Sequence, residues 1–492
     1  MARSRTSSAS ELLVDLRRDD ALPLHHQLEL ELRAAIRGGR LQAEAVLPST
    51  RALAEQLGVS RGVVVEAYEQ LVAEGYLSSQ PGGTTRVCAT MTEPPVVAES
   101  RRRPPPHRID FGYGRPDVTQ FPRQVWLRSL RRVLNEAPSE RLSYLDPRGA
   151  PELCDALAAY LNRVRGTVAH ADRLVICNGF AQALGLVTQV VAANGGTRLA
   201  VEDPGQLDSI RAARQGGLEV IPIPVDDAGI LVDALARADP DAVVLTPAHH
   251  FPTRAVLSAE RRALLVAWAK DRGRLILEDD YDAEYRYDRE PIGALQGLAP
   301  EQVIYAGSAS KTLAPGLRLG WLVVPTTLVD QVAATKAATD RGSASLEQLA
   351  FADFVSRGEF DHHLRRMRPI YRARRDALLA ALTRYLPELR PVGASAGLHV
   401  LAWLPDGIDE ATLVERAAEL GVGVEGLTPY RSASSVGPGG LLFGYGTVTE
   451  GGIEEGVRLI AGLTSRKRID RSGRTAQAQL AASGVKVAPT GG

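Results

Sequence analysis

The sequence predicts a multidomain chain in which a small helical unit precedes a larger α/β unit. Its 492 residues, 45% hydrophobic and 24% charged, are typical of a soluble globular chain too long for one ordinary domain. A segment rich in proline and arginine, "CATMTEPPVVAESRRRPPPHR", interrupts the chain at residues 88–108. Beyond it, short apolar runs alternate with stretches of helical period, which predicts an α/β fold around a largely parallel sheet. The runs are "RLVICN", "RLAVED", "LEVIPI", "DAVVLTP", "GRLILEDD", "QVIYAGS" and "LGWLVVP".

These features predict four parts of the chain. The N-terminal unit covers residues 20–88, and a stiff, solvated linker follows at 89–108 because prolines favour extended backbone. The α/β unit covers residues 109–465, and longer helical stretches from about residue 370 predict a small α+β subdomain at 370–465. Residues 466–492 are predicted to be a disordered tail, since their apolar content is too low to offset the entropy of ordering.

The composition favours a cytoplasmic protein without a membrane partner. No uninterrupted apolar run reaches the roughly 18 to 20 residues that cross a bilayer, and the N-terminus leads into acidic residues instead of an apolar signal core. Cys88, Cys154 and Cys177 lie far apart without metal-ligand spacing, so we expect structural thiols and no metal ion. The net charge of zero neither indicates nor excludes a nucleic-acid partner, because a local patch can be hidden in a neutral total.

The N-terminal unit is predicted to contain three helices and a hairpin. The first helix stops at a Gly-Gly pair and carries an apolar stripe at four-residue spacing, formed by Leu24, Leu28, Leu32 and Ile36. A second helix runs from the cap Ser49 to Leu57, and a turn at Gly58 leads to a third helix capped by Ser60. Two helices joined by a tight turn form a helix-turn-helix. The segment "YLSSQPGGTTRV" then predicts two short strands around a turn, as in a wing.

The stretch "LPSTRALAEQLGVSRGVVVEAYEQLVAEGYL" resembles the winged helix-turn-helix of the GntR family. The resemblance implies that the partner is double-stranded DNA, with the second helix of the motif in the major groove and the wing on the adjacent groove or backbone. An arginine at a helix start can bind phosphate or a guanine edge, and a serine there can donate to phosphate. The DNA contacts that the resemblance assigns are Arg51, Ser60, Arg61, Gly82 and Gly83.

This N-terminal unit is not basic overall. Residues 1–87 contain ten arginines against eleven acidic residues, so DNA affinity must come from the placement of the arginines and from dimerisation. The wing segment "GGTTRV" departs from the Gly-Ser-Gly-Thr pattern of the family. An ordinary protein-binding helical bundle stays open as the alternative for these helices.

The α/β unit carries groups suited to an aldehyde cofactor with a pyridine ring and a phosphate. An amine that bonds such a cofactor, here Lys311, needs an acid for the pyridine nitrogen, a donor for the phenolic oxygen and a cradle for the phosphate. The segment "LILEDDYDAEYRY" places Asp279 and Tyr281 directly after an apolar strand, where α/β sheets build ligand sites. The candidate phosphate ligands are the side chains of Ser308 and Arg318 and the backbone N–H groups at a helix start, residues Gly179, Phe180 and Gln182.

In chain order, "NGFAQAL", "VEDPG", "TPAHHFPT", "EDDYDAEYRY" and "SASKTLAPGLRLGW" resemble the fold type I aminotransferase domain of the MocR subfamily, in which a GntR-type reader is fused to that domain. The resemblance covers about residues 23–465 and implies pyridoxal 5′-phosphate as the cofactor and a homodimer as the assembly. The roles that it implies are an internal aldimine for Lys311, the pyridine nitrogen for Asp279, the 3′ oxygen for Tyr281, and the phosphate for Ser308 and Arg318.

Two positions depart from the family pattern. Gln206 stands after "EDPG" where the family has an aromatic ring that stacks on the cofactor, a contact worth about 0.5 to 1.5 kcal/mol. Arg254 ends "HHFPTR" where "HQFPTG" would end in glycine, and it is expected to contact an effector carboxylate or to face solvent. Arg431 in "LTPYRSASS" is a second candidate anchor for an amino-acid carboxylate. His249 and His250 are expected to be structural, because no metal-ligand cluster accompanies them.

The sequence thus predicts a DNA-binding transcriptional regulator that senses pyridoxal phosphate, or a small amine or amino acid, through an aldimine at Lys311. An active aminotransferase with an appended DNA-binding unit is the alternative, since it would keep the same lysine and aspartate, and a partial transamination half-reaction is compatible with the regulator. A third alternative, a regulator that has lost its cofactor, rests on Gln206 alone.

Overall fold

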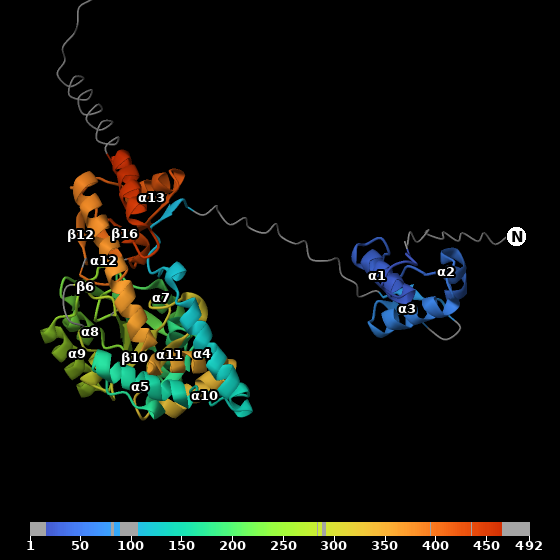
Figure 1. Ribbon diagram of the computed structural model, residues 1–492, viewed down its shortest axis with the longest axis horizontal. Coiled ribbons are helices and arrows are strands. Elements are labelled where there is room, and N and C mark those ends of the chain that lie inside the picture. Colours follow the sequence, from blue (N-terminus) through green and yellow to red (C-terminus); the bar gives the residue numbers. More distant parts are fainter. Residues whose placement is uncertain are drawn as a thin grey trace, which may run out of the picture. The chain divides into compact units, whose positions relative to one another are not determined.

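The chain folds as two compact units, Met1–Pro104 and Pro105–Gly492 (Figure 1). The computed structural model describes residues 16–79, 83–88 and 107–464, except 283, 288–291, 394 and 434. Most of the predicted linker and all of the predicted tail at 466–492 therefore lie outside the described residues.

The N-terminal unit is the predicted winged helix-turn-helix. Its helices are α1 (Leu24–Arg37), α2 (Thr50–Leu57) and α3 (Arg61–Ala73), and its antiparallel strands are β1 (Leu77–Ser78) and β2 (Arg86–Val87). The Ser49 hydroxyl oxygen accepts a hydrogen bond from the Ala52 N–H at 3.2 Å, and Gly58 ends α2 with a φ of 64°. Ser60 occupies the N-cap position of α3, but its side chain caps no backbone N–H. The three helices pack around a core that includes Leu28, Leu32, Leu53, Val64 and Leu71.

An eight-stranded mixed sheet forms the centre of the larger unit, in the order β4-β11-β10-β9-β8-β5-β6-β7. The pairs β11–β10, β11–β4 and β6–β7 are antiparallel, and the other pairs are parallel. Each predicted apolar run forms one of these strands. The bounds are β4 Leu174–Cys177, β5 Arg198–Asp203, β6 Glu219–Asp226, β7 Gly229–Ile230, β8 Ala242–Leu245, β9 Leu275–Asp280, β10 Val303–Ser308 and β11 Gly320–Val323.

Helices cover both faces of this sheet (Figure 1). Alternate residues of one strand point to opposite faces: in β4, Ile176 packs in the core formed with α5 and α11, whereas Val175 packs in the core formed with α6 and α10. The helices are α4 (Arg123–Glu136), α5 (Pro151–Arg165), α6 (Phe180–Ala193), α7 (Leu207–Gln215), α8 (Val232–Ala238), α9 (Ala259–Arg272), α10 (Val329–Asp340) and α11 (Ser345–Ser356). Short 3-10 helices are η1 (Val118–Gln120), η2 (Ser139–Leu142), η3 (Ala171–Arg173), η4 (Leu295–Gly297), η5 (Pro315–Leu317) and η6 (Thr428–Tyr430).

A smaller α+β subdomain is built on a second, antiparallel sheet of order β12-β13-β16-β15. Its strands are β12 (Arg390–Val392), β13 (His399–Trp403), β15 (Glu425–Gly426) and β16 (Gly440–Gly444), and its helices are α13 (Glu410–Glu419) and a last helix at 450–464. The segment that opens the unit, β3 (Ile109–Asp110), pairs in parallel with β14 (Val422–Gly423). The subdomain therefore includes residues from the start of the unit as well as from its end.

One long helix crosses the predicted subdomain boundary near residue 370. Helix α12 runs unbroken from Glu359 to Tyr385 and carries Pro369 inside it. A proline inside a helix removes one backbone donor and strains the preceding turn, which hides the continuity of the helix in the sequence pattern. Because α12 spans the boundary, the two subdomains share this helix.

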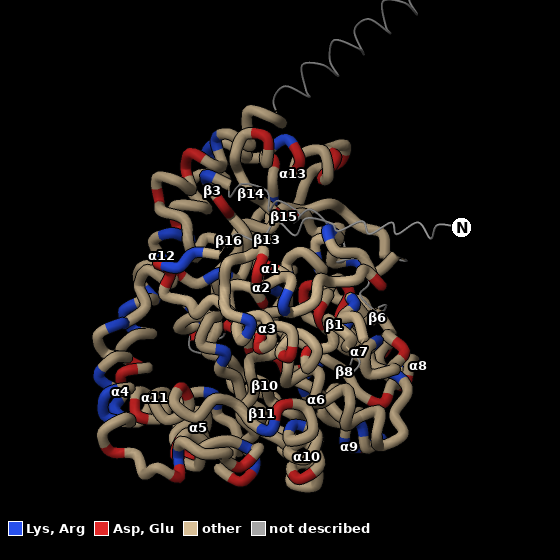
Figure 2. The backbone as a smooth tube through the Cα atoms, turned by 90° about the vertical axis from the view of Figure 1, so that its right-hand side faces the viewer, with Lys and Arg blue, Asp and Glu red and all other residues tan. Residues whose placement is uncertain are grey.

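Basic and acidic residues are interspersed along the backbone of the larger unit (Figure 2). Helix α4 is an exception, with the basic sequence "RQVWLRSLRRVLNE". Among the described helices, none combines the length and the apolar character that crossing a membrane requires.

Candidate functional site

Most of the predicted cofactor residues lie at or just after the carboxyl ends of β9 and β10, which are neighbours in the sheet. Asp279 is paired with Ala306 across the parallel β9–β10 ladder, and Ser308 ends β10. Parallel strands bring their carboxyl ends to one edge, where α/β sheets bind ligands. The fold therefore brings Asp279 and Ser308 to the same edge.

Asp279 is a buried carboxylate with one side-chain partner. Its Oδ2 atom accepts a hydrogen bond from Gln206 Nε2 at 2.7 Å. Burial raises the pKa of Asp279 to about 7, and the hydrogen bond from Gln206 and the nearby Lys311 charge act in the opposite direction. A carboxylate in this state can pair with a protonated pyridine nitrogen at the pH of the cell.

Lys311 lies close to Asp279 and contacts the start of the unit. Its Nζ atom donates a hydrogen bond to the Gly114 carbonyl oxygen at 2.6 Å. Burial lowers the pKa of Lys311, while the charges of Asp282 and Asp279 oppose that shift. A lowered pKa increases the neutral fraction of the amine, which is the form that attacks an aldehyde.

The predicted phosphate cradle brings Gly179 and Arg318 together at the start of α6. Gly179 is the N-cap of α6 with a φ of 85°, and a Cβ atom on it would lie 3.0 Å from Arg318 Nη2. Arg318 also donates a hydrogen bond to the Asn178 carbonyl oxygen. Since the first N–H groups of a helix lack partners inside it, a guanidinium and free N–H groups meet at this point.

The other predicted phosphate ligands are partly engaged elsewhere. The Ser308 hydroxyl donates to the Leu319 carbonyl oxygen at 3.3 Å and accepts from the Ser310 N–H at 3.1 Å. Gln182 Nε2 donates to Asp340 Oδ2 at 2.5 Å, and the buried amine of Lys336 donates to Gln182 Oε1 at 3.2 Å. Phe180 packs against the core beneath α6. For Phe180 and Gln182, the backbone N–H is therefore the group that an anion could use.

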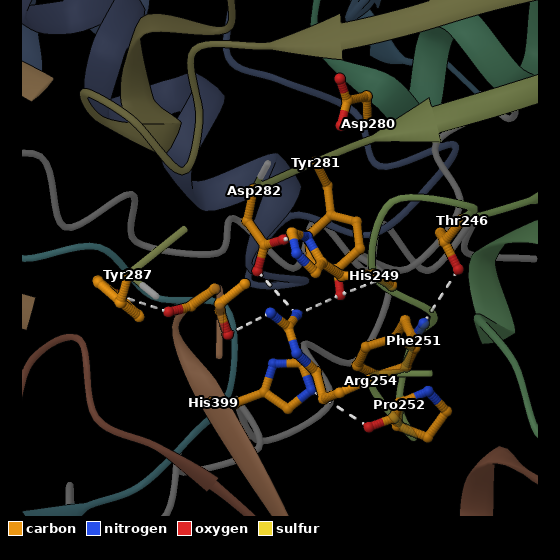
Figure 3. Close-up of polar contacts among 12 residues, drawn as sticks. Thr246, His249, Phe251, Pro252, Arg254, Asp280, Tyr281, Asp282, Tyr287 and His399 are labelled. Carbon is orange, nitrogen blue, oxygen red and sulfur yellow. Dashed lines mark hydrogen bonds and ion pairs between the residues drawn. The ribbon is translucent and has the colours of Figure 1, made fainter. Parts of the chain in front are cut away.

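Tyr281 and Arg254 form a buried polar cluster with Asp282 (Figure 3). Arg254 Nη1 donates to the Tyr281 hydroxyl at 2.8 Å and to Asp282 Oδ2 at 3.0 Å, and Arg254 Nη2 donates to the Ala396 carbonyl oxygen. The Tyr281 hydroxyl donates to the His249 carbonyl oxygen at 3.2 Å. The side chain of Arg254 is 0% exposed. The expectation that Arg254 faces solvent is thus wrong, whereas its contact with an effector carboxylate stays a prediction. In this structure its carboxylate partner is Asp282, which no local sequence pattern indicates.

Arg431 follows the 3-10 helix η6 in the small subdomain, whereas His249 and His250 lie in the loop that follows β8. Arg431 Nη2 donates to the Pro438 carbonyl oxygen at 2.9 Å, within its own loop, and Arg431 lines a cavity of about 370 Å³ together with Asp203. His249 Nδ1 lies 3.6 Å from Asp282 Oδ1, and His250 Nδ1 lies 2.7 Å from the Thr253 hydroxyl oxygen. Both histidines are buried, as their expected structural role requires.

The predicted DNA-contact residues are exposed at the adjacent starts of two helices. Arg51 lies in the first turn of α2, Ser60 is at the N-cap position of α3, and Arg61 begins α3; all three are exposed. Arg61 Nε donates to the Thr50 hydroxyl oxygen at 3.4 Å, which links the two helix starts. Gly83 is exposed next to the hairpin, and Gly82 lies outside the described residues.

Comparison with known proteins decides the family. Residues 24–87 match the bacterial regulatory proteins of the gntR family, and residues 106–417 match the aminotransferase class I and II family. The probable rhizopine catabolism regulatory protein MocR of Rhizobium meliloti is 32% identical over 90% of this chain and 94% of its own length. The chain belongs to the MocR subfamily of GntR-type transcriptional regulators.

Other similar proteins agree with this MocR assignment. The HTH-type pyridoxine biosynthesis transcriptional regulator PdxR of Corynebacterium glutamicum is 31% identical over 90% of this chain and 96% of its own length. Among solved structures, an archaeal alanine:glyoxylate aminotransferase matches with a TM-score of 0.67 and 27% identity, over 73% of this chain and 91% of that chain. The larger unit of this MocR-type chain therefore has the fold type I aminotransferase architecture.

The residues of this MocR-type site fit pyridoxal phosphate, which the aminotransferase family implies. The donor set provides one buried carboxylate, Asp279, one amine of lowered pKa, Lys311, and one guanidinium, Arg318, at a helix start. The approach of Arg318 to Gly179 leaves no room for a side chain at that N-cap. These groups would be the partners of the ring nitrogen, the aldehyde and the phosphate of that cofactor.

Three participants in the site escaped the sequence analysis. Asp282 binds Arg254, Gly114 binds Lys311, and Asn178 binds Arg318. The acidic run "EDDYD" was a signal for Asp282, but the run alone does not indicate which of its members faces an arginine. The contacts of Gly114 and Asn178 use backbone carbonyl groups, and these carry no residue-type signal.

Proposed function

We propose that this MocR-type regulator binds pyridoxal phosphate covalently through Lys311 and senses either the cofactor itself or a small amino compound that displaces Lys311. In this proposal, the state of Lys311 biases the DNA binding of the helix-turn-helix unit. We further propose that the regulator acts as a homodimer, which would present two readers to two half-sites of an operator.

The observation that carries the proposal is the pairing of Lys311 with Asp279 in one buried site. Each group shifts the pKa of the other, so the amine and the carboxylate lie within electrostatic reach. An isolated buried lysine would be costly, and so would an isolated buried aspartate. Their occurrence together at the carboxyl end of the sheet supports a site for a ligand that needs both.

The other predicted residues have matching roles in the proposal. When bound, pyridoxal phosphate supplies an aldehyde that bonds amines and a ring that withdraws electrons. Asp279 would hold the proton on the ring nitrogen. Tyr281 would donate its hydroxyl proton to the 3′ oxygen in place of the His249 carbonyl oxygen. Ser308 and Arg318 would bind the phosphate together with the N–H groups that follow Gly179.

The contact between Lys311 and Gly114 supports a route for the signal. Gly114 follows β3, which is the first strand after the predicted linker at 89–108. An amine that displaces Lys311 would free its Nζ atom to donate to the Gly114 carbonyl oxygen. The occupancy of Lys311 would thus change a hydrogen bond in the segment that joins the linker to the larger unit.

The absorption spectrum of the full chain with pyridoxal phosphate tests the proposal. We expect a visible band that is absent in Lys311→Ala and retained in the matched control Lys270→Ala, since Lys270 is exposed on α9. The full chain should also bind DNA from the region upstream of its own gene with an affinity that changes when the cofactor is added. A band that persists in Lys311→Ala, or its absence in both proteins, contradicts the proposal.

An active aminotransferase is the second candidate. The match to aminotransferase structures and the retained pair Lys311 and Asp279 favour it. Sustained amino transfer from an amino acid to a keto-acid acceptor would support the enzyme. A single half-reaction, or none, would support the sensor.

A further inference from the structure

The buried guanidinium of Arg254 joins two parts of the larger unit. On one side it donates to the Tyr281 hydroxyl at 2.8 Å and to Asp282 Oδ2 at 3.0 Å, both in the segment that follows β9. On the other side it donates to the Ala396 carbonyl oxygen, in the segment between β12 and β13 of the small subdomain. One side chain therefore holds a candidate cofactor ligand and the small subdomain at once.

The small subdomain is shaped to receive Arg254. A Cβ atom on Gly393 would lie 2.0 Å from Arg254 Cβ, and a Cβ atom on Gly397 would lie 1.9 Å from Arg254 Nη2. Both glycines have a positive φ, of 79° and 74°. Arg254 itself has a φ of 66°, in the left-handed region that an L-residue rarely adopts. Arg254 thus occupies a strained backbone position, and its side chain fills space that is open because residues 393 and 397 are glycines.

The receiving segment is itself bonded to the segment after Tyr281. The Gly397 N–H donates to the Tyr285 carbonyl oxygen at 2.7 Å, and the Tyr287 N–H donates to the Ser395 carbonyl oxygen at 3.0 Å. The Tyr287 hydroxyl donates to the Gly397 carbonyl oxygen at 2.8 Å. The two segments are therefore joined by backbone and side-chain hydrogen bonds, and Arg254 adds a charged contact to this connection.

The charges around Arg254 are balanced. Asp282 is the anionic partner, and the guanidinium holds the pKa of that carboxyl far below its usual range. His249 and His399 face the same pair, and burial lowers the pKa of both imidazoles, so they stay neutral. Arg254 also acts to lower the pKa of the Tyr281 hydroxyl, which burial raises. A hydroxyl that accepts from a cation is a stronger donor through its own proton.

We propose that Arg254 is a positioning residue: it fixes the Tyr281 hydroxyl at the cofactor site and anchors that hydroxyl to the 393–397 segment of the small subdomain. The inference rests on the proposed function in one respect, because it takes Tyr281 as the donor to the 3′ oxygen of the cofactor. The anchoring of the segment stands on the contacts of Arg254 alone.

Two variants of Arg254 test the positioning of the hydroxyl. Arg254→Met keeps most of the length and removes the charge, whereas Arg254→Gly removes the side chain and the strain of the positive φ. A donated hydrogen bond and a nearby positive charge both ease the loss of the proton on the nitrogen that joins Lys311 to the cofactor. We therefore expect the pH midpoint of the visible band to rise in both variants by on the order of one pH unit, a tenfold change in proton affinity. Tyr281→Phe should also raise the pH midpoint of the band. In the Tyr281→Phe background, Arg254→Gly should raise this midpoint by less than it does in the wild-type chain, because the hydroxyl that Arg254 positions is then absent.

Amide hydrogen exchange of the cofactor-free protein tests the anchoring. We expect the amides of Gly397 and Tyr287 to exchange at least tenfold faster in Arg254→Gly than in the wild-type chain.

Two more variants complete the test of the hydroxyl. Arg254→Lys should bring the pH midpoint of the visible band part of the way back to the wild-type value, since it keeps the charge. Arg262→Met is the matched control, because Arg262 is also buried but donates to Gly293 and Leu257; it should lower stability and leave the midpoint unchanged.

The outcomes separate this inference from the proposed function. A midpoint that moves in Tyr281→Phe but stays at the wild-type value in Arg254→Gly and Arg254→Met overturns the positioning role. Unchanged exchange of Gly397 and Tyr287 overturns the anchoring. A visible band that persists in Lys311→Ala contradicts the proposed function instead, and the exchange of these two amides still decides whether Arg254 anchors the segment.

Discussion

Gln206 donates a hydrogen bond from Nε2 to Asp279 Oδ2 at 2.7 Å. Gln206 is the N-cap residue of α7, at the position where the family has an aromatic ring that stacks on the cofactor. The amide donor favours the ionised form of Asp279, whereas burial raises the pKa of this group to about 7. Gln206 thus favours the ionised form of the carboxylate that would hold the cofactor ring. This effect comes in addition to the loss of the aromatic stacking contact.

Replacing Gln206 should therefore change the pH dependence of cofactor binding. In Gln206→Leu we expect the pKa of Asp279 to rise further, so at pH 7 less of the carboxyl is ionised and ready to pair with a protonated ring nitrogen. A hydrogen bond to a charged group is worth about 1.5 to 3 kcal/mol, so we expect affinity at neutral pH to fall about tenfold or more and to recover at higher pH. Titration of the visible band across pH measures this, with Gln331→Leu on α10 as the control. Equal losses at every pH would mean that Gln206 contributes contact area alone.

The sequence predicted those parts of the site that depend on residue type and spacing. Lys311, Asp279 and Arg318 were found because their chemistry and order suit one cofactor, and the strands were found because their apolar runs are short and regular. The bond from Gln206 to Asp279 joins residues 73 positions apart, and the bond from Arg254 to Ala396 joins residues 142 apart. Such pairings depend on which strand ends and loops meet in the fold, and no local pattern contains that information.

Gly114 should be needed for the reactivity of Lys311. Gly114 has a φ of 67°, and a Cβ atom on it would lie 2.8 Å from Lys311 Nζ. Gly114→Ala should therefore push the amine from its place and slow the appearance of the visible band, besides costing about 1 to 2 kcal/mol of stability for the left-handed backbone. Gly166→Ala is the matched control, because Gly166 has a φ of 64° and open space around it. If both variants lose stability and neither changes the band, Gly114 has only a backbone role.

Arg318 should determine the preference for the phosphorylated form of the cofactor. It lies against the N-cap Gly179 of α6, where free N–H groups attract an anion. We expect Arg318→Ala to weaken pyridoxal phosphate about ten- to a hundredfold while leaving pyridoxal, which lacks the phosphate, nearly unaffected. Competitive binding of the two compounds gives the ratio, and Arg148→Ala provides an arginine control paired with Asp146. Equal weakening of both compounds would contradict the phosphate assignment.

The stability of the larger unit should fall in mild acid because two buried histidines resist protonation. Burial lowers the pKa of His250 and of His399 to about 3, from an ordinary value of 6.5. The unfolded chain takes up these protons first, so stability is full above pH 6.5 and is lost as the pH falls towards about 3, by up to about 1.4 kcal/mol per pH unit for each imidazole. Denaturant unfolding at a series of pH values measures the slope. His399→Gln should flatten it, and His170→Gln, at an exposed histidine, should not. An unchanged slope in His399→Gln would show that this imidazole does not titrate on unfolding.

The helix starts of the N-terminal unit should carry the DNA contacts. Arg51 and Arg61 are exposed and lie next to each other through the bond from Arg61 to Thr50, so both can reach one stretch of duplex. The double variant Arg51→Ala with Arg61→Ala should weaken binding to the chain's own upstream region at least a hundredfold, since each arginine contact to a base or phosphate is worth about 1 to 3 kcal/mol. The log of affinity should also depend less steeply on the log of salt concentration. Arg40→Ala, an exposed arginine beyond the end of α1, is the matched control, and the cofactor spectrum should be the same in all three proteins. Wild-type DNA affinity in the double variant would contradict the assignment of α2 and α3 as the reading helices.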